Sequence, residues 1–583
     1  MAINNTKVPF DFKLLSRVLA FVKPYRMLFY GSIVFSIMLG LFSIARPIII
    51  EHIVDNFIVD ADPEMLLSYS LVMFGLLFFE AIFQFIFMYA ANWIGQSVVK
   101  DIRKNLFEKI LSFKLKYFDQ NPIGALVTRT ISDIETIAEI FSGGILVIFS
   151  DLFKIILIAS WMFSRSVMLS CLSLAVFPVL IWATKYFQTA MKSAFESERS
   201  AISKLNTFVQ EHITGMKIIQ VFNREEMELE RFKQVNLGFK NATIKAIWHF
   251  SIFLPVIEIM SAISLGAMVW YGGLNMLLGG EVTLGLMMSF ILFINMLFRP
   301  VRHLADRINV LQRGVVAATR VFKIIDSDDN VHENGTLDLN EVKGEVVFKH
   351  VNFSYKDDEP VLKNVSFKID EGKTLAIVGA TGAGKSSIVN LLLRFYKINS
   401  VAIFLDGKDI SNYKLHSLRS HLALVLQDVF LFSDTIFKNI VLDKEISLDE
   451  VKLASKAIGL EGFIDQLPGG YNYNVRERGV MLSAGQRQLI AFLRAYVSNP
   501  SVLILDEATS SVDSQSEQLI QEATAKLTQG RTSIVIAHRL DTIKNADKIL
   551  VMDRGEIVQS GSHSALLATK GYYSDLFDLQ YSE

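Results

Sequence analysis

Long apolar runs dominate the first half of the chain and are absent from the second half. Before residue 300, six runs are long enough to cross a bilayer, which requires about 20 mostly apolar residues. A set of buried helices in one large soluble core is the alternative, but the hydropathy of so many runs favours membrane spans. We place the spans at about 28–50, 68–95, 143–163, 167–187, 247–272 and 282–298.

The connections between these predicted spans differ in charge. Lys and Arg are concentrated in residues 98–117 and 188–246, whereas the opposite connections are short or acidic, as in DADPE at 60–64. The positive-inside rule therefore places the two long connections and both termini in the cytoplasm. The two long connections have helical periodicity. We therefore expect the spans to continue as helices into the cytoplasm and the connections to turn near 118–126 and 211–219.

A polar linker at 326–342 separates the predicted membrane domain, residues 1–325, from the rest of the chain. Residues 10–26 predict an amphipathic helix that lies along the inner membrane surface. From 343 to 583, short β-rich runs alternate with helical ones, which indicates an α/β domain with a largely parallel sheet. The predicted fold class is an all-α six-helix transmembrane domain with long cytoplasmic helical extensions, followed by an α/β domain.

Composition agrees with this division. The chain has 583 residues, which is too long for one compact domain, and 51% of them are hydrophobic. The net charge of −1 gives no reason to expect a nucleic-acid partner. The single cysteine, Cys171, excludes an intrachain disulfide. The first residues lack an apolar core followed by a cleavage site, so we expect no signal peptide.

Residues 379–387, GATGAGKSS, fit the phosphate-binding pattern G-x-x-x-x-G-K-[ST] between an apolar strand and a helix. Backbone N–H groups of such a loop surround phosphates, the lysine adds a mobile positive charge, and the serine hydroxyl can bind Mg²⁺. The predicted phosphate-binding residues are Gly379, Ala380, Thr381, Gly382, Ala383, Gly384, Lys385, Ser386 and Ser387.

Residues 501–507, SVLILDE, predict a buried strand that ends in two acids. Asp506 is placed to hold Mg²⁺, and Glu507 to orient or deprotonate a water that attacks the γ-phosphate. Three further residues at strand ends or turns are ordinary when taken singly and gain weight from their order along the chain. They are Gln427, which could sense Mg²⁺ or the attacking water, His538, which could touch the γ-phosphate, and Tyr355, which could stack on adenine.

A second phosphate-binding element lies about a hundred residues after the first. VMLSAGQRQL at 480–489 predicts a turn that opens a helix, with Ser483 placed to cap it. Free N–H groups at a helix N-terminus bind anions.

With these motifs in this order, the chain resembles a bacterial ATP-binding cassette (ABC) exporter half-transporter of the multidrug or lipid type. The resemblance extends to YFDQNPIGALVTRTISDIETI at 117–137 and covers nearly the whole chain. It implies coupling segments at about 117–126 and 211–220, with Glu477 as their contact on the ATPase domain. Ala484 stands where the commonest signature has glycine, and 399–407 lacks a usual glycine, which predicts only a local turn change.

The resemblance also implies cofactors and residue roles. ATP and Mg²⁺ would be the cofactors, with Ser386, Gln427 and Asp506 at the metal and Glu507, His538 and Gln427 in catalysis. Tyr355 and the loop 379–387 would contact ATP bound to the same chain. A second set of residues would close over ATP held by a second half-transporter: Ser483, Ala484, Gly485, Gln486 and Asp513.

The function this implies is ATP-driven export, or flipping between leaflets, of a hydrophobic or amphipathic substrate across the cytoplasmic membrane by a dimer. A homodimer is favoured, and a heterodimer in which this chain carries the intact site stays open, as does the choice between lipid flippase and drug exporter. A non-transport membrane ATPase or a regulated channel is a remote alternative. Polar residues within the spans either line a cargo cavity or pair helices, as Asp151 with Lys154 would; they are Arg46, Glu80, Gln84, Asp151, Lys154 and Glu258.

Overall fold

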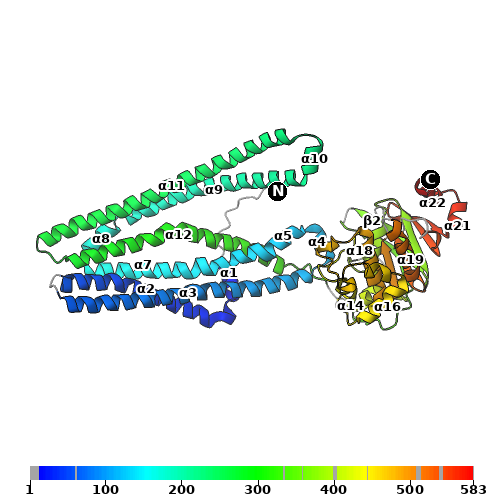
Figure 1. The fold of residues 1–583 in the computed structure, drawn as a ribbon, viewed down its shortest axis with the longest axis horizontal. Coiled ribbons are helices and arrows are strands. Elements are labelled where there is room, and N and C mark those ends of the chain that lie inside the picture. The colour runs from blue at the N-terminus through cyan, green and yellow to red at the C-terminus, as the bar shows by residue number, and fades with distance from the viewer. Residues whose placement is uncertain are drawn as a thin grey trace. The chain divides into compact units, whose positions relative to one another are not determined.

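The computed structural model describes residues 12–58, 62–331, 335–356, 359–397, 403–442, 444–506, 514–536 and 543–581 (Figure 1). The chain forms two compact units. The first, a membrane unit, comprises Met1–Leu111 and Pro122–Asp328, and the second, an ATPase unit, comprises Ser112–Asn121 and Asp329–Glu583.

The membrane unit is built from long helices (Figure 1). Helix α2 packs against α3, α7 and α12, and α11 packs against α9 and α12. Single π-helical turns interrupt the chain at Ile53–Ile58, Arg129–Asp133 and Ile140–Ile145. The helices are α1 (Phe12–Ala20), α2 (Arg26–His52), α3 (Pro63–Leu111), α5 (Ile123–Thr128), α6 (Ile134–Glu139), α7 (Leu146–Arg165), α8 (Val167–Leu174), α9 (Phe177–Thr214), α10 (Met216–Val221), α11 (Glu225–Leu277) and α12 (Leu284–Ile325).

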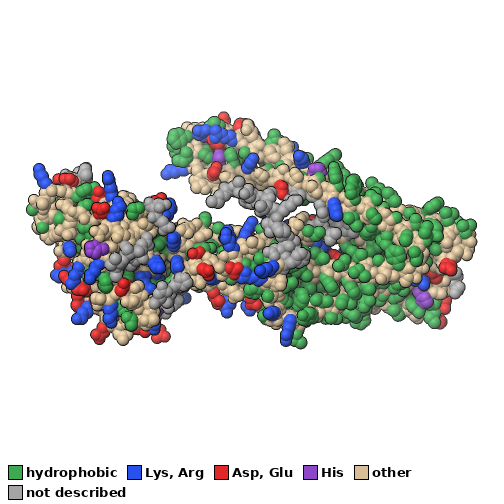
Figure 2. Space-filling model, turned by 180° about the vertical axis from the view of Figure 1, so that it is seen from behind, with side chains coloured by type: hydrophobic (Ala, Val, Ile, Leu, Met, Phe, Trp, Pro, Cys, Tyr) green, Lys and Arg blue, Asp and Glu red, His purple; other side chains and the backbone are tan. Residues whose placement is uncertain are grey.

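Apolar side chains cover the outside of this unit (Figure 2). Phe74, Phe78 and Phe85 of α3 are all more than half exposed, an arrangement that suits lipid rather than water. Within the described residues, five helical stretches are long and apolar enough to cross a membrane, and the apolar start of α12, Leu284–Pro300, is shorter. The sixth predicted span coincides with that start. The five stretches are Lys23–Ile58, Pro63–Leu111, Ile123–Arg165, Val167–Thr214 and Glu225–Leu277.

Helices α9 and α11 form the long hairpin that the sequence predicts, and α10 closes its far end (Figure 1). Near this end, the His212 ring lies 2.9 Å from a Glu228 carboxylate oxygen, which ties α9 to α11. The predicted amphipathic helix is shorter than expected: α1 ends at Ala20, and a 3₁₀ turn that contains Pro24 leads into α2. Arg17 fastens α1 to the end of α12 through a two-pronged ion pair with Asp326, at 2.5 and 2.6 Å.

Charged residues inside the membrane unit pair between helices. Asp151 of α7 pairs with Arg307 of α12, with 3.1 Å between carboxylate oxygen and Nε. The ion pair that Asp151 makes therefore joins two helices, whereas the pairing interpretation of the sequence named Lys154 on the same helix. Lys154 instead lies within electrostatic reach of charges on three helices, which are Glu80, Asp151, Arg299 and Arg307.

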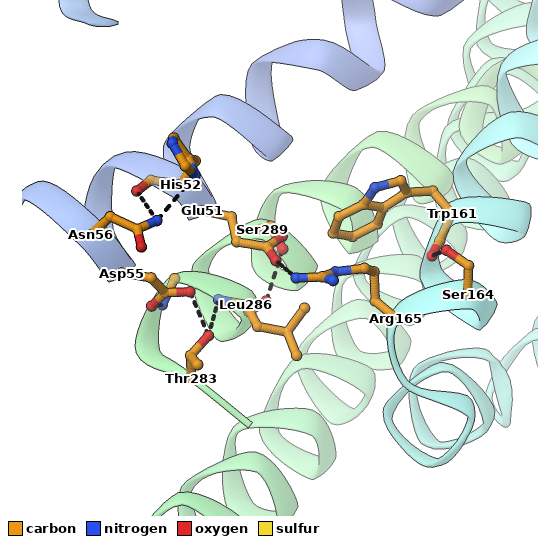
Figure 3. Close-up of polar contacts among 11 residues, drawn as sticks. Glu51, His52, Asp55, Asn56, Trp161, Ser164, Arg165, Thr283, Leu286 and Ser289 are labelled. Atoms are coloured by element: carbon orange, nitrogen blue, oxygen red, sulfur yellow. Dashed lines mark hydrogen bonds and ion pairs between the residues drawn. The ribbon is translucent and has the colours of Figure 1, made fainter. Parts of the chain in front are cut away.

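A polar cluster joins the C-terminal end of α2 to the end of α7 and the start of α12 (Figure 3). Arg165 donates to the buried carboxylate of Glu51 at 2.5 Å. Asp55 accepts hydrogen bonds from the Thr283 hydroxyl at 2.5 Å and from the Gly285 N–H at 2.7 Å. Only glycine fits at 285, since a Cβ atom there would collide with the Glu51 carbonyl oxygen and the Asp55 carboxylate.

The ATPase unit contains two sheets. A six-stranded sheet has the order β10-β9-β3-β8-β7-β6, in which all strands are parallel except β10, and a four-stranded antiparallel sheet has the order β2-β1-β4-β5. The strands are β1 (Val346–Ser354), β2 (Pro360–Ile369), β3 (Thr374–Gly379), β4 (Ile403–Leu405), β5 (Lys408–Asp409), β6 (Leu422–Val425), β7 (Val502–Asp506), β8 (Thr532–Ile536), β9 (Lys548–Asp553) and β10 (Glu556–Gly561).

The parallel sheet is buried on both faces. Leu375 and Ile377 of β3 face the core shared with the four-stranded sheet and α13, whereas Ala376 and Val378 face the core shared with α15 to α19. This architecture confirms the predicted fold class. The helices are α4 (Leu115–Gln120), α13 (Lys385–Leu392), α14 (Leu415–Ser420), α15 (Ile436–Val441), α16 (Leu448–Ile458), α17 (Glu461–Asp465), α18 (Ala484–Val497), α19 (Ser514–Thr528), α21 (His563–Ala568) and α22 (Tyr572–Tyr581).

Removal of one partner of the Glu51–Arg165 pair should cost different amounts of stability on the two sides. The Glu51 side chain is only 6% exposed, whereas the Arg165 side chain is 53% exposed. Arg165→Met leaves a buried carboxylate without its cation, which we expect to destabilise the protein by up to about 3 kcal/mol. Glu51→Gln leaves a solvated guanidinium and should cost clearly less. Thermal midpoints of the purified protein in detergent measure both variants.

The double variant Glu51→Gln/Arg165→Met is the control. It should be more stable than Arg165→Met alone, since no buried charge is left. Equal destabilisation by the two single variants would contradict this description of the pair.

Candidate functional site

Three predicted site segments meet at one edge of the parallel sheet. The phosphate loop follows β3, Asp506 ends β7, and Gln427 lies two residues beyond the end of β6. Because β3, β8, β7 and β6 are neighbours that run parallel, their carboxyl ends lie at the same edge, which is where ligands bind in open α/β sheets.

The loop 379–384 has the conformation that phosphate binding requires. Gly379, Gly382 and Gly384 all have positive φ angles, of 153°, 85° and 97°. A Cβ atom on Gly384 would lie 2.7 Å from Leu362 Cδ2 and 3.1 Å from the Val361 carbonyl oxygen. Sequence and packing therefore both demand glycine here, and the N-terminus of α13 opens directly from the loop.

Lys385 folds back over this loop. Its ammonium donates to the carbonyl oxygens of Gly379 at 2.8 Å and Ala380 at 3.0 Å. Burial lowers the pKa of Lys385, and the charge of Asp506 acts in the opposite direction. Among the described residues the hydrogen-bond partners of Lys385 are these two carbonyls, so the buried ammonium is positioned to be drawn toward an incoming phosphate.

The candidate Mg²⁺ residues lie at the same edge of the sheet as this loop. Ser386 is exposed on the first turn of α13, Asp506 ends β7, and the exposed Gln427 follows β6. Among the residues that the structure describes, no three His, Cys, Asp or Glu side chains are grouped to hold a metal. A carboxylate and a hydroxyl are oxygen donors of the kind that Mg²⁺ takes together with nucleotide phosphates.

Tyr355 lies beside the phosphate-loop helix. Its hydroxyl is 3.2 Å from both Ser387 Oγ and Asn390 Nδ2 of α13. Its ring packs edge-on against Phe353 and Tyr396, with centroid distances of 4.8 and 4.9 Å. The predicted adenine-stacking residue is therefore held from several sides.

The second predicted phosphate-binding element has the expected helix start. Ser483 Oγ accepts from the Gln486 N–H at 3.2 Å, and Gln486 Oε1 accepts from the Ser483 N–H at 3.0 Å, so α18 begins with a capping box. Within the described part of the chain, the N–H groups of Ala484 and Gly485 have no acceptor. The exposed Ser483 and Ala484 leave this N-terminus open to solvent.

Three of the predicted site residues, Glu507, His538 and Asp513, lie outside the described residues. Their roles therefore stay predictions, as does the contact predicted for Glu477, which is exposed in a 3₁₀ turn at Glu477–Gly479.

Comparison with known proteins identifies the relatives of this chain. Residues 28–301 match the family described as "ABC transporter transmembrane region", and residues 362–510 match the family "ABC transporter". An uncharacterized ABC transporter ATP-binding protein of Bacillus subtilis, YknV, is 35% identical over 98% of this chain and 96% of that protein. The chain belongs to the ABC transporter family.

Two further relatives carry more informative names. An ATP-dependent lipid A-core flippase of Syntrophus aciditrophicus is 34% identical over 97% of this chain and 94% of that protein. A putative multidrug export ATP-binding/permease protein of Bacillus subtilis, YgaD, is also 34% identical, over 97% of this chain and 99% of that protein. The solved structure of a bacterial Atm1-family ABC exporter with ATP bound has a TM-score of 0.75, 26% identity, and coverage of 96% of this chain and 99% of that one.

These matches confirm the resemblance found in the sequence. The transporter is a multi-pass membrane protein with an ABC exporter fold, and its ATPase domain binds and hydrolyses ATP to drive transport. The half-transporter organisation implies a dimer.

One contact of the ATPase unit escaped prediction. Tyr396 lies between Tyr355 and Asp119 of α4, and its hydroxyl donates to the Asp119 carboxylate. Asp119 lies within the predicted coupling segment, but no sequence pattern indicates that Tyr396, 277 residues further along the chain, is its partner.

Gly384→Ala tests the geometry of the phosphate loop. The added methyl group meets Leu362 and the Val361 carbonyl, and the residue also needs a positive φ. We expect ATP affinity to fall by roughly tenfold or more, equivalent to about 1.4 kcal/mol. Binding of a fluorescent ATP analogue to the purified transporter measures this.

Gly372→Ala is the matched control, because Gly372 also has a positive φ, of 70°, but has no atom within 4 Å of the added Cβ. It carries the backbone strain without the collision, so ATP affinity should stay unchanged. Equal loss of affinity in both variants would show that strain alone, not the packing of the loop, explains the effect.

Proposed function

We propose that the transporter exports a hydrophobic or amphipathic substrate across the cytoplasmic membrane, or moves it from the inner to the outer leaflet, by alternating access of a dimer. The observation that carries this proposal is the presence, in one chain, of an ABC membrane region and a nucleotide-binding edge with its phosphate loop and second helix N-terminus. The Lys- and Arg-rich connections support a cytoplasmic location for the ATPase domain and both termini.

In this proposal each nucleotide-site residue has a separate task. Lys385 and the N–H groups of the loop bind the phosphates, and Tyr355 contacts adenine. Ser386, Gln427 and Asp506 hold Mg²⁺, which supplies charge neutralisation on the phosphates when bound. Glu507 orients or deprotonates the attacking water, and His538 contacts the γ-phosphate.

The dimer explains why one chain has two phosphate-binding helix N-termini. ATP on the loop of one subunit would be covered by Ser483, Ala484, Gly485 and Gln486 of the other, with Asp513 between the two sites. ATP then stabilises the closed state because the open state lacks half of its contacts. The methyl group of Ala484 would alter the strength of closure more than the chemistry.

We favour a homodimer, because this chain retains both Glu507 and His538 and so provides everything that two active sites require. A heterodimer in which this chain carries the intact site is the second candidate. Two differently tagged copies should co-purify from one membrane if the homodimer is correct. Recovery of only one tag together with a different half-transporter would establish the heterodimer.

The substrate is either a lipid or an amphipathic drug-like compound. The relatives named for lipid A flipping and for multidrug export are equally similar to this chain, so the choice depends on measurement. ATPase activity of the transporter in proteoliposomes, measured with a panel of lipids and amphipathic compounds, should rise with the true class. ATP-dependent movement of that compound tests export directly, and ATP hydrolysis without movement of any panel member would favour a non-transport ATPase.

Glu507→Gln tests the assignment of the catalytic base. The variant should bind ATP with unchanged affinity but accumulate an ATP-bound closed dimer, because the amide cannot accept a proton from water. We expect the hydrolysis rate to fall by roughly a hundredfold or more. Phosphate release and size-exclusion chromatography with ATP measure the two effects.

Glu517→Gln is the control, because Glu517 is a carboxylate in the first turn of α19. This variant should hydrolyse ATP at the wild-type rate. Wild-type hydrolysis by Glu507→Gln would exclude Glu507 as the base.

A further inference from the structure

The chain directly before the predicted coupling segment is attached to the rest of the ATPase unit by its own backbone. Residues 112–114 pair with residues 329–331: the Lys114 N–H donates to the Asp329 carbonyl at 3.0 Å and the Val331 N–H donates to the Ser112 carbonyl at 2.8 Å. The Ser112 hydroxyl donates to Asn330 at 2.9 Å. Helix α4 follows at once, so its start is fixed relative to the ATPase core.

At the other end of α4, the Tyr396 hydroxyl donates to the Asp119 carboxylate. Burial, and then the bond to Asp119, raise the pKa of Tyr396 well above its usual value. The phenol is therefore protonated at any physiological pH and remains a donor. A hydrogen bond to an ionised carboxylate is among the stronger ones available to a side chain.

The position of Tyr396 is itself set by the phosphate-loop helix. Tyr396 follows α13 after a tight turn in which the Phe395 N–H donates to the Asn390 carbonyl at 3.0 Å. Arg394 has a positive φ of 51° and donates to the carbonyls of Ile410 and Tyr413, and Arg419 stacks over Phe395. The turn is thus held on several sides, and movement of α13 would carry Tyr396 with it.

The ring of Tyr396 contacts Tyr355 edge-on, at 88° between the planes. Tyr355 in turn is bound through its hydroxyl to Ser387 and Asn390 of α13. Tyr355, Tyr396 and Asp119 thus form a continuous path of contacts from the nucleotide site to α4, and every residue of this path belongs to the ATPase unit.

We propose that Tyr396 is a positioning residue whose ring supports Tyr355 and whose hydroxyl holds Asp119, so that ATP binding is transmitted to the coupling segment of the same chain. The proposal rests on the proposed adenine contact of Tyr355. Its two halves are separable, because the ring serves the nucleotide and the hydroxyl serves the coupling segment.

Hydrogen–deuterium exchange of residues 112–121 tests this without knowledge of the substrate. In the wild-type transporter in nanodiscs, ATP should slow exchange of this segment by about fivefold or more, the lower end of typical coupling between sites. Tyr396→Phe should abolish that change while ATP affinity stays within about twofold, since the ring remains. Tyr396→Ala should also weaken ATP binding, and Asp119→Asn/Tyr396→Phe should be no worse than Tyr396→Phe alone.

Tyr496→Phe is the matched control, because Tyr496 is also half-buried and its ring packs on Arg531, away from this path. It should retain the full response to ATP. An unchanged ATP response in Tyr396→Phe, or none in the wild type with ATP bound, would overturn the proposal. The wild-type transporter could instead show the exchange response to ATP but move no member of the panel of lipids and amphipathic compounds. That result would contradict the export function and leave the role of Tyr396 standing.

Discussion

Unsatisfied backbone N–H groups at two helix N-termini are the constraint on which the nucleotide chemistry of this transporter depends. At the start of α13, glycines with positive φ angles shape the loop, and Lys385 turns back onto its carbonyls. At the start of α18, the capping box satisfies two N–H groups and leaves those of Ala484 and Gly485 open. Helix N-termini of this kind bind anions.

The membrane unit obeys the complementary rule that buried charge must be paired. Asp151 with Arg307 and Glu51 with Arg165 each join helices that lie far apart in the sequence. Because a buried or half-buried carboxylate is costly without its cation, such pairs restrict which helices can be neighbours. If the ends of α2, α7 and α12 separate as access alternates, the contacts of Glu51 and Asp55 are among those that must break.

The membrane helices and the phosphate loop could be predicted from the sequence. Apolar runs indicated the membrane helices, and the glycine pattern between strand and helix indicated the phosphate loop, because both follow from local physics. The parallel strands then brought Asp506 and Gln427 to the edge where the loop lies.

Contacts between distant segments were not accessible in the same way. The sequence suggests Lys154, a neighbour on the same helix, as one possible partner of Asp151, whereas the ion pair in the structure is with Arg307 on α12. Tyr396 and Asp119 each look ordinary in the sequence, and only packing brings them together. A single sequence gives no signal for such pairs, since side-chain identity alone does not specify which surfaces meet.

In the proposed dimer, each ATP is bound between the phosphate loop of one subunit and the α18 N-terminus of the other. Mixed dimers test it most directly, with Lys385→Ala and Ser483→Arg placed either on different subunits or on the same subunit opposite a wild-type partner. If ATP is shared in this way, the dimer with the changes on different subunits keeps one intact site and hydrolyses ATP, whereas the dimer with both changes on one subunit loses both sites. The reverse result, with activity only when both changes share a subunit, would contradict it.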